Sequence, residues 1–218
     1  MNFDTIRAKL LRLDTACLCD ANKQVRLMDP GIRPLRLGLK LVGIAHTVSC
    51  EDDFLTVIKG LSDAQPGQVL VVDTRNSPRA VAGELFSREA QRRGLAGIVV
   101  DGAVRDTEKI RALGIAVYSR FVTPVAGTTR KIFATQIAIP CGGVTVNPGD
   151  VVFGDDDGVV VASQAELAQL IPQAEAIQQV EEQVLARMDK GENLITMLNF
   201  EEHYRAIQDH RESQLKFA

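Results

Sequence analysis

The chain has 218 residues, a formal net charge of −3 at pH 7, and 45% hydrophobic and 24% charged residues. This balance predicts one large globular domain or a domain with an extension. A nucleic-acid partner is not expected, because the chain has no basic surplus for phosphates, no tryptophan and only 5% aromatic residues for base stacking. No apolar run approaches the ~20 residues of a membrane span, and the charged N-terminal segment lacks the apolar core of a signal peptide. We therefore expect no membrane partner and a cytoplasmic location, where the four cysteines would stay reduced.

The first two thirds of the chain predict helices followed by alternating strands and helices. Apolar residues at helical spacing predict a helix over residues 3–13, and Asp14 and Thr15 can cap a second helix that carries Asp20. Prolines and a glycine make residues 26–35 irregular. Strands are then expected at 40–50, 68–74, 97–100 and 115–120, and helices at 53–61, 80–94 and 105–114. This alternation is typical of parallel βαβ units.

The last third changes character. Residues 137–162 predict strands joined by tight turns, and we interpret the acidic run GDDDG (154–158) as a solvated hairpin turn. A long helix over 165–191, interrupted by Pro172, and a helical tail over 200–218 follow. We divide the chain into a main domain over 1–195 and a C-terminal helical tail over 196–218 that lies at a subunit contact.

Charged residues gather after one strongly apolar strand, in the stretch GIVVDGAVRD (97–106). Asp101 and Gly102 are expected to form a turn, with Arg105 and Asp106 directly after it. Glu84 opens the preceding helix, and 20 residues separate it from Arg105. Both positions follow strands of a parallel sheet, and ligands gather at the carboxyl ends of such strands. Where the sheet geometry allows it, this spacing brings both positions to opposite walls of one pocket.

Each of these residues also has a purely structural explanation. Asp106 can be the N-cap of the helix that follows it, and Glu84 is an ordinary acid for a first helical turn. Arg105 alone is a common type of surface cation, and Asp20 alone is a common type of solvated acid. The joint spacing is what favours a functional site.

The segment GELFSREAQRRGLAGIVVDGAVRD resembles the RraA-like family, most closely its metal-dependent 4-hydroxy-4-methyl-2-oxoglutarate/4-carboxy-4-hydroxy-2-oxoadipate aldolase branch. The family signature is an acidic residue, 20 residues, then Arg-Asp, and the resemblance extends over DTACLCDA, IRPL and GDDDGVVV. It implies an α/β fold, an αββα sandwich with a central β-structure, flanking helices and here a C-terminal helical extension.

The resemblance implies a class II aldolase that cleaves a 4-hydroxy-2-oxo acid to pyruvate and a second oxo acid. Oxaloacetate decarboxylation would follow from the same pyruvate enolate. Asp106 would ligate Mg²⁺ or Mn²⁺, and Glu84 would hold a water bound to the metal. Asp20 matches an acidic position that the family uses near the waters of the metal. Arg105 would bind the substrate oxygens and stabilise the enolate.

Further implied contacts involve a helix N-terminus and a second subunit. After Gly83, the backbone N–H groups of Leu85 and Phe86 would bind the pyruvate carboxylate. The family's assemblies are trimers or hexamers in which a neighbouring C-terminal helix supplies an acid, here Glu181 or Glu182, although both also suit a solvated helix face. The alternative function is a non-catalytic regulator of a ribonuclease that acts by protein–protein contact.

Overall fold

The computed structural model describes residues 1–217 and divides into two compact units, of which the first is Met1–Ala174 and the second begins at Glu175. The helices of the first unit are α1 (Phe3–Leu10), α2 (Thr15–Ala21), α3 (Leu55–Asp63), α4 (Glu84–Arg92) and α5 (Thr107–Arg111). Helix α6 (Gln164–Met188) runs from the first unit into the second, which also contains the 3₁₀-helix η1 (Leu194–Met197) and α7 (Phe200–Gln208). The domain boundary expected at residues 195 and 196 falls inside the second unit and stays a prediction.

All the strands belong to the first unit. They are β1 (Arg26–Leu27), β2 (Arg33–Pro34), β3 (Leu41–Ser49), β4 (Gln68–Asp73), β5 (Ala80–Ala82), β6 (Gly97–Val104), β7 (Ala116–Val122), β8 (Ile139–Cys141), β9 (Val144–Val146), β10 (Val151–Gly154) and β11 (Val159–Ala162). The main sheet has the order β1-β11-β10-β3-β4-β6-β7-β2, and β5 also pairs with β6. Strands β3, β4, β6 and β7 run parallel, as the βαβ alternation predicted, and the outer strands are antiparallel.

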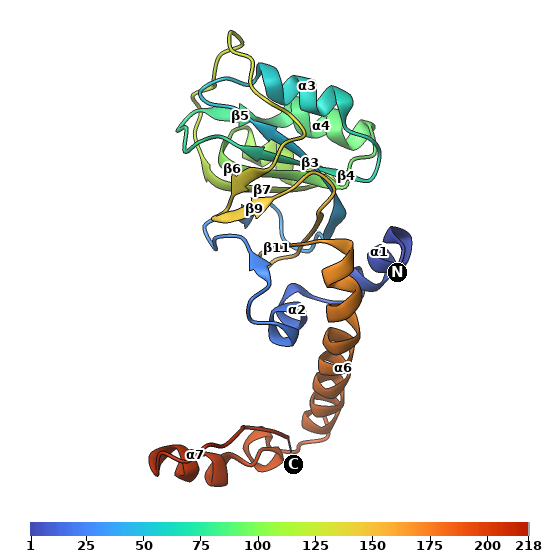
Figure 1. The fold of residues 1–218 in the computed structure, drawn as a ribbon, viewed down its shortest axis with the longest axis vertical. Coiled ribbons are helices and arrows are strands. Elements are labelled where there is room, and N and C mark those ends of the chain that lie inside the picture. The colour runs from blue at the N-terminus through green and yellow to red at the C-terminus, as the bar shows by residue number, and fades with distance from the viewer. Residues whose placement is uncertain (218) are drawn as a thin grey trace. The chain divides into compact units, whose positions relative to one another are not determined.

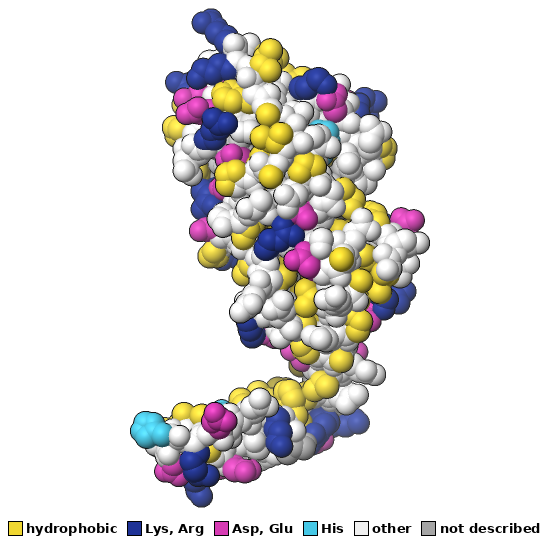
Figure 2. Space-filling model, viewed as in Figure 1, with side chains coloured by type: hydrophobic (Ala, Val, Ile, Leu, Met, Phe, Trp, Pro, Cys, Tyr) yellow, Lys and Arg dark blue, Asp and Glu magenta, His cyan; other side chains and the backbone are white. Residues whose placement is uncertain are grey.

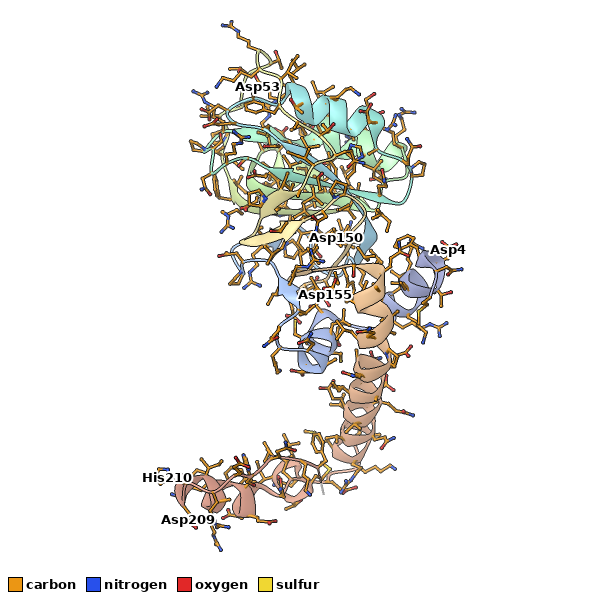
Figure 3. All side chains as sticks on the ribbon, viewed as in Figure 1. Asp4, Asp53, Asp150, Asp155, Asp209 and His210 are labelled. Atoms are coloured by element: carbon orange, nitrogen blue, oxygen red, sulfur yellow. The ribbon has the colours of Figure 1, made fainter. Side chains whose placement is uncertain are left out.

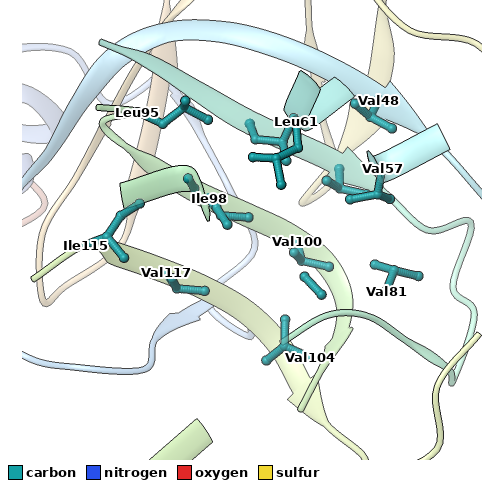
Figure 4. Close-up of a cluster of buried hydrophobic side chains, with 14 of the residues drawn as sticks. Val48, Val57, Leu61, Val81, Leu95, Ile98, Val100, Val104, Ile115 and Val117 are labelled. Carbon is teal, nitrogen blue, oxygen red and sulfur yellow. The ribbon is translucent and has the colours of Figure 1, made fainter. Parts of the chain in front are cut away.

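The central strands are buried on both faces. Ile98 and Val100 point toward α3 and α4, where they form a core cluster with Val57 and Leu61 (Figure 4). Val99, between them in sequence, points to the opposite face, which the β8–β9 hairpin covers (Figure 1). Burial on both faces explains why these strands are continuous hydrophobic runs. The predicted mixed α/β fold with a central sheet and flanking helices is confirmed.

The helix expected over residues 80–94 begins only at Glu84. Ala80–Ala82 instead form strand β5, parallel to the end of β6. Small side chains suit this position, because β5 is buried along its whole length. Gly83 is extended, with φ −163°, and stands between β5 and α4 as the N-cap of that helix.

Asp101 and Gly102 do not form a turn, because β6 continues through them to Val104. The sheet register shifts between Val100 and Ala103, and a Cβ on Gly102 would lie 2.1 Å from the Thr74 Oγ1 atom. Asp101 forms an ion pair with Arg120 and accepts a hydrogen bond from Gly142 N at 2.6 Å. The prediction of a short strand followed by a turn is therefore wrong. Strand β6 is longer than expected, and Arg105 directly follows its last residue.

Three smaller expectations are also corrected. Helix α6 continues through Pro172, which is exposed, while Ile171 and Ala174 beside it are fully buried. Within the irregular segment 26–35, the two-residue strands β1 and β2 pair with β11 and β7. The C-terminal tail is helical only to Gln208, after which the chain returns to form a bridge between Leu198 and Phe217.

The acidic run GDDDG is not simply a solvated turn, because its first aspartate is buried (Figure 3). Asp155 accepts hydrogen bonds of 2.7 Å from both the backbone N–H and the hydroxyl of Thr15. Its backbone carbonyl accepts a third, of 2.9 Å, from the Tyr118 hydroxyl. Asp155 therefore ties the start of α2 to the central sheet, while Asp156 and Asp157 are exposed as expected.

Charges of both signs are interspersed over the first unit on the face that Figure 2 shows. Within residues 1–217, no helix combines the length and the apolarity that crossing a bilayer requires.

Replacing Asp155 tests this tie. Asp155→Ala should lower the free energy of unfolding by about 2–4 kcal/mol, because it leaves the buried Thr15 donors without a charged acceptor. Asp157→Ala, two residues on and exposed, should change it by less than about 0.5 kcal/mol. Urea denaturation of both variants makes the comparison, and equal effects would contradict this role of Asp155.

Candidate active site

A small pocket of about 130 Å³ opens where β5, α4 and the end of β6 meet. Its lining residues come from four segments of the chain and are mostly apolar. They are Phe54, Ala80, Val81, Ala82, Gly83, Leu85, Phe86, Arg105, Asp106 and Ala126. The two charged residues among them are Arg105 and Asp106, the pair that the sequence spacing indicates.

Backbone pairing brings the two halves of the sequence signature together. Because β5 runs beside β6, Arg105 N donates a 3.1 Å hydrogen bond to Ala82 O. Close by, Glu84 N lies 3.3 Å from Asp106 Oδ2 and donates to it. Gly83 stands between these two contacts, and a Cβ there would lie 2.6 Å from Asp106 Oδ2 and 3.0 Å from Arg105 Cγ. A side chain at position 83 would therefore displace the Asp106 carboxylate from its present position.

Asp106 occupies the N-cap position of α5, yet its side chain makes no capping hydrogen bond to that helix. Its backbone is left-handed, with φ 58°. The carboxylate turns toward the pocket, where Oδ2 lies 3.5 Å from Arg105 Nε. The side chain of Asp106 therefore does not cap α5, contrary to the purely structural explanation.

Glu84 lies in the first turn of α4 and is held by two cations. Its carboxylate accepts a 2.8 Å hydrogen bond from Arg88 Nε and lies 3.2 Å from Lys109 Nζ. The hydrogen bond from Arg88, together with the one from Lys109, lowers the pKa of Glu84. Glu84 is therefore ionised at neutral pH, and its own backbone N–H binds the carboxylate of Asp106.

The start of α4 offers backbone donors at the pocket. The first hydrogen bond within this helix runs from Ser87 N to Gly83 O, at 3.0 Å. The N–H groups of Leu85 and Phe86 precede it, so they have no carbonyl partner within the helix. Both residues line the pocket, and Leu85 is 74% exposed. These donors and the helix dipole favour an anion here.

Glu84 is joined to Asp106 through its backbone N–H but does not line this pocket, and neither do the remaining predicted site residues. Asp20, at the end of α2, forms an ion pair with Lys23. Glu181 and Glu182 belong to α6 in the second unit, where Glu182 accepts a hydrogen bond from Gln178. The fold thus brings together Gly83, Glu84, Leu85, Phe86, Arg105 and Asp106.

Residues 15–161 match the model of the RraA-like family, described as Aldolase/RraA. The chain belongs to the RraA-like family. A protein of Halalkalibacterium halodurans that carries the name "Putative 4-hydroxy-4-methyl-2-oxoglutarate aldolase" is 35% identical over 164 residues, which are 74% of this chain and 78% of that protein.

Two solved structures share the fold. One is RraAS2 of Streptomyces coelicolor, described as an unusual member of the RNase ES inhibitor RraA protein family. It is 32% identical, with a TM-score of 0.75 over 84% of this chain and 98% of that one. The other is an uncharacterized Pseudomonas syringae protein, 27% identical, with a TM-score of 0.79 over 88% of this chain and 96% of that one. These relatives include both an aldolase name and an RNase-inhibitor name.

Asp106, the acidic side chain that lines this pocket among the described residues, suits a magnesium-type ion better than a transition metal. Within residues 1–217 no group of three or more His, Cys, Asp or Glu side chains gathers in a metal-binding arrangement. Mg²⁺ does not need such a cage, because it binds through one or two carboxylates and keeps several waters. The oxygen donors of Asp106, with the ionised Glu84 nearby, fit that requirement.

Sequence reasoning missed the wall opposite α4. Phe54 lines the pocket and packs edge-to-face on Phe86, with ring centroids 5.8 Å apart. Ala126 also lines the pocket and comes from the loop 123–136, whose tip stands at the top of Figure 1. In the sequence Phe54 looks like part of an ordinary amphipathic helix, and Ala126 has no distinguishing chemistry, so no sequence signal indicated either residue.

Asp53, which is labelled in Figure 3, anchors this loop. It is completely buried. Its Oδ2 accepts hydrogen bonds from the Thr128 hydroxyl at 2.7 Å and from the N–H groups of Arg130 and Lys131 at 2.6 and 3.1 Å. Burial by itself raises the pKa of Asp53. The hydrogen bonds from these donors and from Leu55 N have the larger combined effect, so the pKa is lowered overall. The ionised carboxylate therefore holds the loop that contributes Ala126.

The lowered pKa of Asp53 predicts a pH-dependent stability. A carboxyl group whose pKa falls on folding stabilises the native state at every pH above its unfolded-state pKa of about 3.9. This contribution disappears as the pH falls through the pKa of the folded state. Asp53→Asn should therefore lower the free energy of unfolding by about 1–3 kcal/mol at pH 7, and by progressively less below about pH 4.

Urea titrations at several pH values test this prediction, with the exposed neighbour Glu51→Gln as the control. A difference between wild type and Asp53→Asn that stays constant from pH 7 to pH 3 would contradict it.

Proposed function

We propose that this RraA-like protein is a divalent-metal-dependent class II aldolase. It cleaves a 4-hydroxy-2-oxo acid to pyruvate and a second oxo acid, and it decarboxylates oxaloacetate through the same pyruvate enolate. The observation that carries the proposal is the convergence of the α4 N-terminus, Arg105 and Asp106 on one pocket. The aldolase name of the Halalkalibacterium halodurans relative supports the same reaction class.

The chain's own groups meet each part of the substrate. The N–H groups of Leu85 and Phe86 bind the pyruvate carboxylate, as helix N-termini bind anions. Breaking the C3–C4 bond leaves its electron pair in the enolate of pyruvate, while the 4-hydroxyl gives its proton to water as the new carbonyl forms. The enolate then takes a proton from water at C3 and becomes pyruvate. The Arg105 guanidinium stabilises the charge that develops on the enolate oxygen.

Asp106 would hold the Mg²⁺ or Mn²⁺, with Glu84 as a second negative charge nearby. When bound, such an ion polarises the keto group and acidifies the waters that it carries. Arg88 and Lys109 keep Glu84 ionised and fix its side chain.

We further propose a homo-oligomer, a trimer or hexamer, in which a second copy completes the site. Asp20 does not line the pocket of its own chain, and Glu181 and Glu182 lie in the second unit. Their proposed roles as acids near the metal therefore need an assembly that presents them to this pocket.

The likeness to RraAS2 supports a second candidate function, regulation of a ribonuclease by protein–protein contact. The two candidates differ in what the pocket does. Pyruvate release by the purified protein decides for the aldolase, whereas ribonuclease inhibition that survives Asp106→Ala decides for the regulator.

Metal removal gives the first test. EDTA should abolish pyruvate release from 4-hydroxy-4-methyl-2-oxoglutarate and from oxaloacetate, and added Mg²⁺ or Mn²⁺ should restore it, because carboxylate oxygens bind such ions. Asp106→Asn should remain inactive after metal is added back. Glu108→Gln, an exposed acid on the same helix, should behave like wild type. Full activity in metal-free protein would refute the proposed chemistry.

Arg105→Lys gives the second test. It keeps the charge but loses the planar fork that can meet two oxygens. Turnover should drop by about 10²–10³-fold, the range for losing one donor to a developing oxyanion. The melting temperature should hardly change, because the Arg105 side chain is 45% exposed.

Arg92→Lys, on the exposed last turn of α4, is the matched control, and both variants are compared in kinetics and in thermal melts. Wild-type turnover in Arg105→Lys would remove this residue from the mechanism.

A further inference from the structure

Three contacts join helices α4 and α5 in a closed ring that includes Asp106. The Asp106 carboxylate accepts the hydrogen bond from Glu84 N, at 3.3 Å. The Glu84 carboxylate in turn lies 3.2 Å from Lys109 Nζ. Lys109 closes the ring, because its backbone N–H donates a 3.1 Å hydrogen bond to Asp106 O. Each of these three residues is therefore bound to the other two.

Asp106 depends on its surroundings for its position. Its backbone is left-handed, with φ 58°, a conformation that a non-glycine residue keeps where neighbouring contacts hold it. Helix α5, which follows, has five residues, too few for a helix to be stable by itself. Ile110, which is 1% exposed, anchors this helix in the core. The ring adds contacts at the end of α5 that carries Asp106.

Two cations bind the Glu84 carboxylate, and they come from different helices. Arg88 Nε donates to Glu84 Oε1 at 2.8 Å from one turn further along α4 itself. Lys109 binds the other oxygen, Oε2, from α5. The two cationic side chains are similarly accessible, with 59% and 66% of their surface exposed. Losing Arg88 leaves the ring closed, whereas losing the Lys109 ammonium opens it.

We propose that Lys109 is a positioning residue for the metal ligand Asp106 and that it acts through Glu84. Its ammonium group fixes Glu84, whose backbone N–H holds Asp106 Oδ2. Groups that orient a metal ligand without touching the metal change the affinity of the site for the metal. This inference rests on the proposed metal-dependent function, in which Asp106 holds Mg²⁺ or Mn²⁺.

A positioning role and a simple effect of charge predict opposite results. Lys109 is a positive charge near a cation site, so Coulomb repulsion alone makes its removal strengthen the binding of Mn²⁺. In the positioning role its removal weakens the binding, because the opened ring holds the Asp106 carboxylate less firmly. The sign of the change in affinity therefore separates the two roles.

The test uses the intact chain after EDTA has removed its metal. Electron paramagnetic resonance measures the binding of Mn²⁺. Mass spectrometry measures amide hydrogen exchange in the peptide that contains α5, without metal. The variants are Lys109→Met, which removes the charge, and Lys109→Arg, which keeps it. Arg88→Met removes the other cation from Glu84, and Arg92→Met, on the exposed last turn of α4, is the control. Thermal melts check that each variant is folded.

Lys109→Met should weaken Mn²⁺ binding by about 3- to 10-fold, at or below the lower end of the range for groups that orient a metal ligand. Exchange in α5 should become about 2- to 5-fold faster, the scale for losing one exposed ion pair. Lys109→Arg should recover most of the affinity, because a guanidinium also binds a carboxylate. Arg88→Met should weaken the binding less than Lys109→Met and leave exchange in α5 unchanged, and Arg92→Met should match wild type.

A double variant tests the route through Glu84. Glu84→Gln removes the negative charge that Lys109 binds. Because Lys109 acts through this carboxylate, adding Lys109→Met to Glu84→Gln should cause no further loss of Mn²⁺ affinity.

Four results overturn the inference while leaving the proposed function intact. Lys109→Met could bind Mn²⁺ at least as tightly as wild type, or exchange in α5 could stay unchanged in this variant. Arg88→Met could weaken the binding as much as Lys109→Met, or the losses could add in the double variant. Failure of the wild type to bind Mn²⁺ overturns the proposed metal-dependent function, and the positioning role with it.

Discussion

The short parallel pairing of β5 with the end of β6 is the contact on which the site depends. Six residues, 74–79, separate the end of β4 from the start of β5. The return of the chain to β6 sets Ala82 O against Arg105 N, and it brings Glu84 N to Asp106 Oδ2. Gly83 permits this approach, because a Cβ would collide with the Asp106 carboxylate. Two segments that the sequence separates by a helix and a strand thus form one wall of the pocket.

The electrostatics of the site follow from that contact. The positive end of α4 faces the Asp106 carboxylate, and Arg105 Nε lies 3.5 Å from that carboxylate. Glu84 sits in the same helical turn, but its charge is compensated by Arg88 and Lys109. The backbone N–H groups of Leu85 and Phe86 therefore stay available at the pocket, although charges of both signs lie close to it. Because the Arg105 and Asp106 side chains are partly exposed, they can exchange partners for a substrate or an ion at modest cost.

Buried aspartates at some distance hold the framework in which this contact forms. Asp155 ties α2 to the sheet, and Asp53 ties the loop 123–136 to the start of α3. Each carboxylate accepts several hydrogen bonds, which offset the cost of burying its charge. The apolar clusters on both faces of the sheet keep β5 and β6 in place, so the site rests on a rigid base while the loop contributes one wall.

Periodicity along the chain predicted the alternation of strands and helices, and the spacing of Glu84 from Arg105 and Asp106 indicated one pocket. Leu85 and Phe86 followed from the resemblance to the RraA-like family. Arg105, Asp106, Leu85 and Phe86 do line one pocket, while Glu84 is joined to Asp106 through its backbone N–H. Three other features emerged only from the folded chain: Ala80–Ala82 form a strand, Asp101 lies within β6, and Asp155 is buried. The contribution of Phe54 and Ala126 to the pocket lining belongs with them. The physical reason is that these features depend on contacts between segments that are distant in sequence. A short apolar run or a single charged residue carries no local pattern that identifies the segment it will contact.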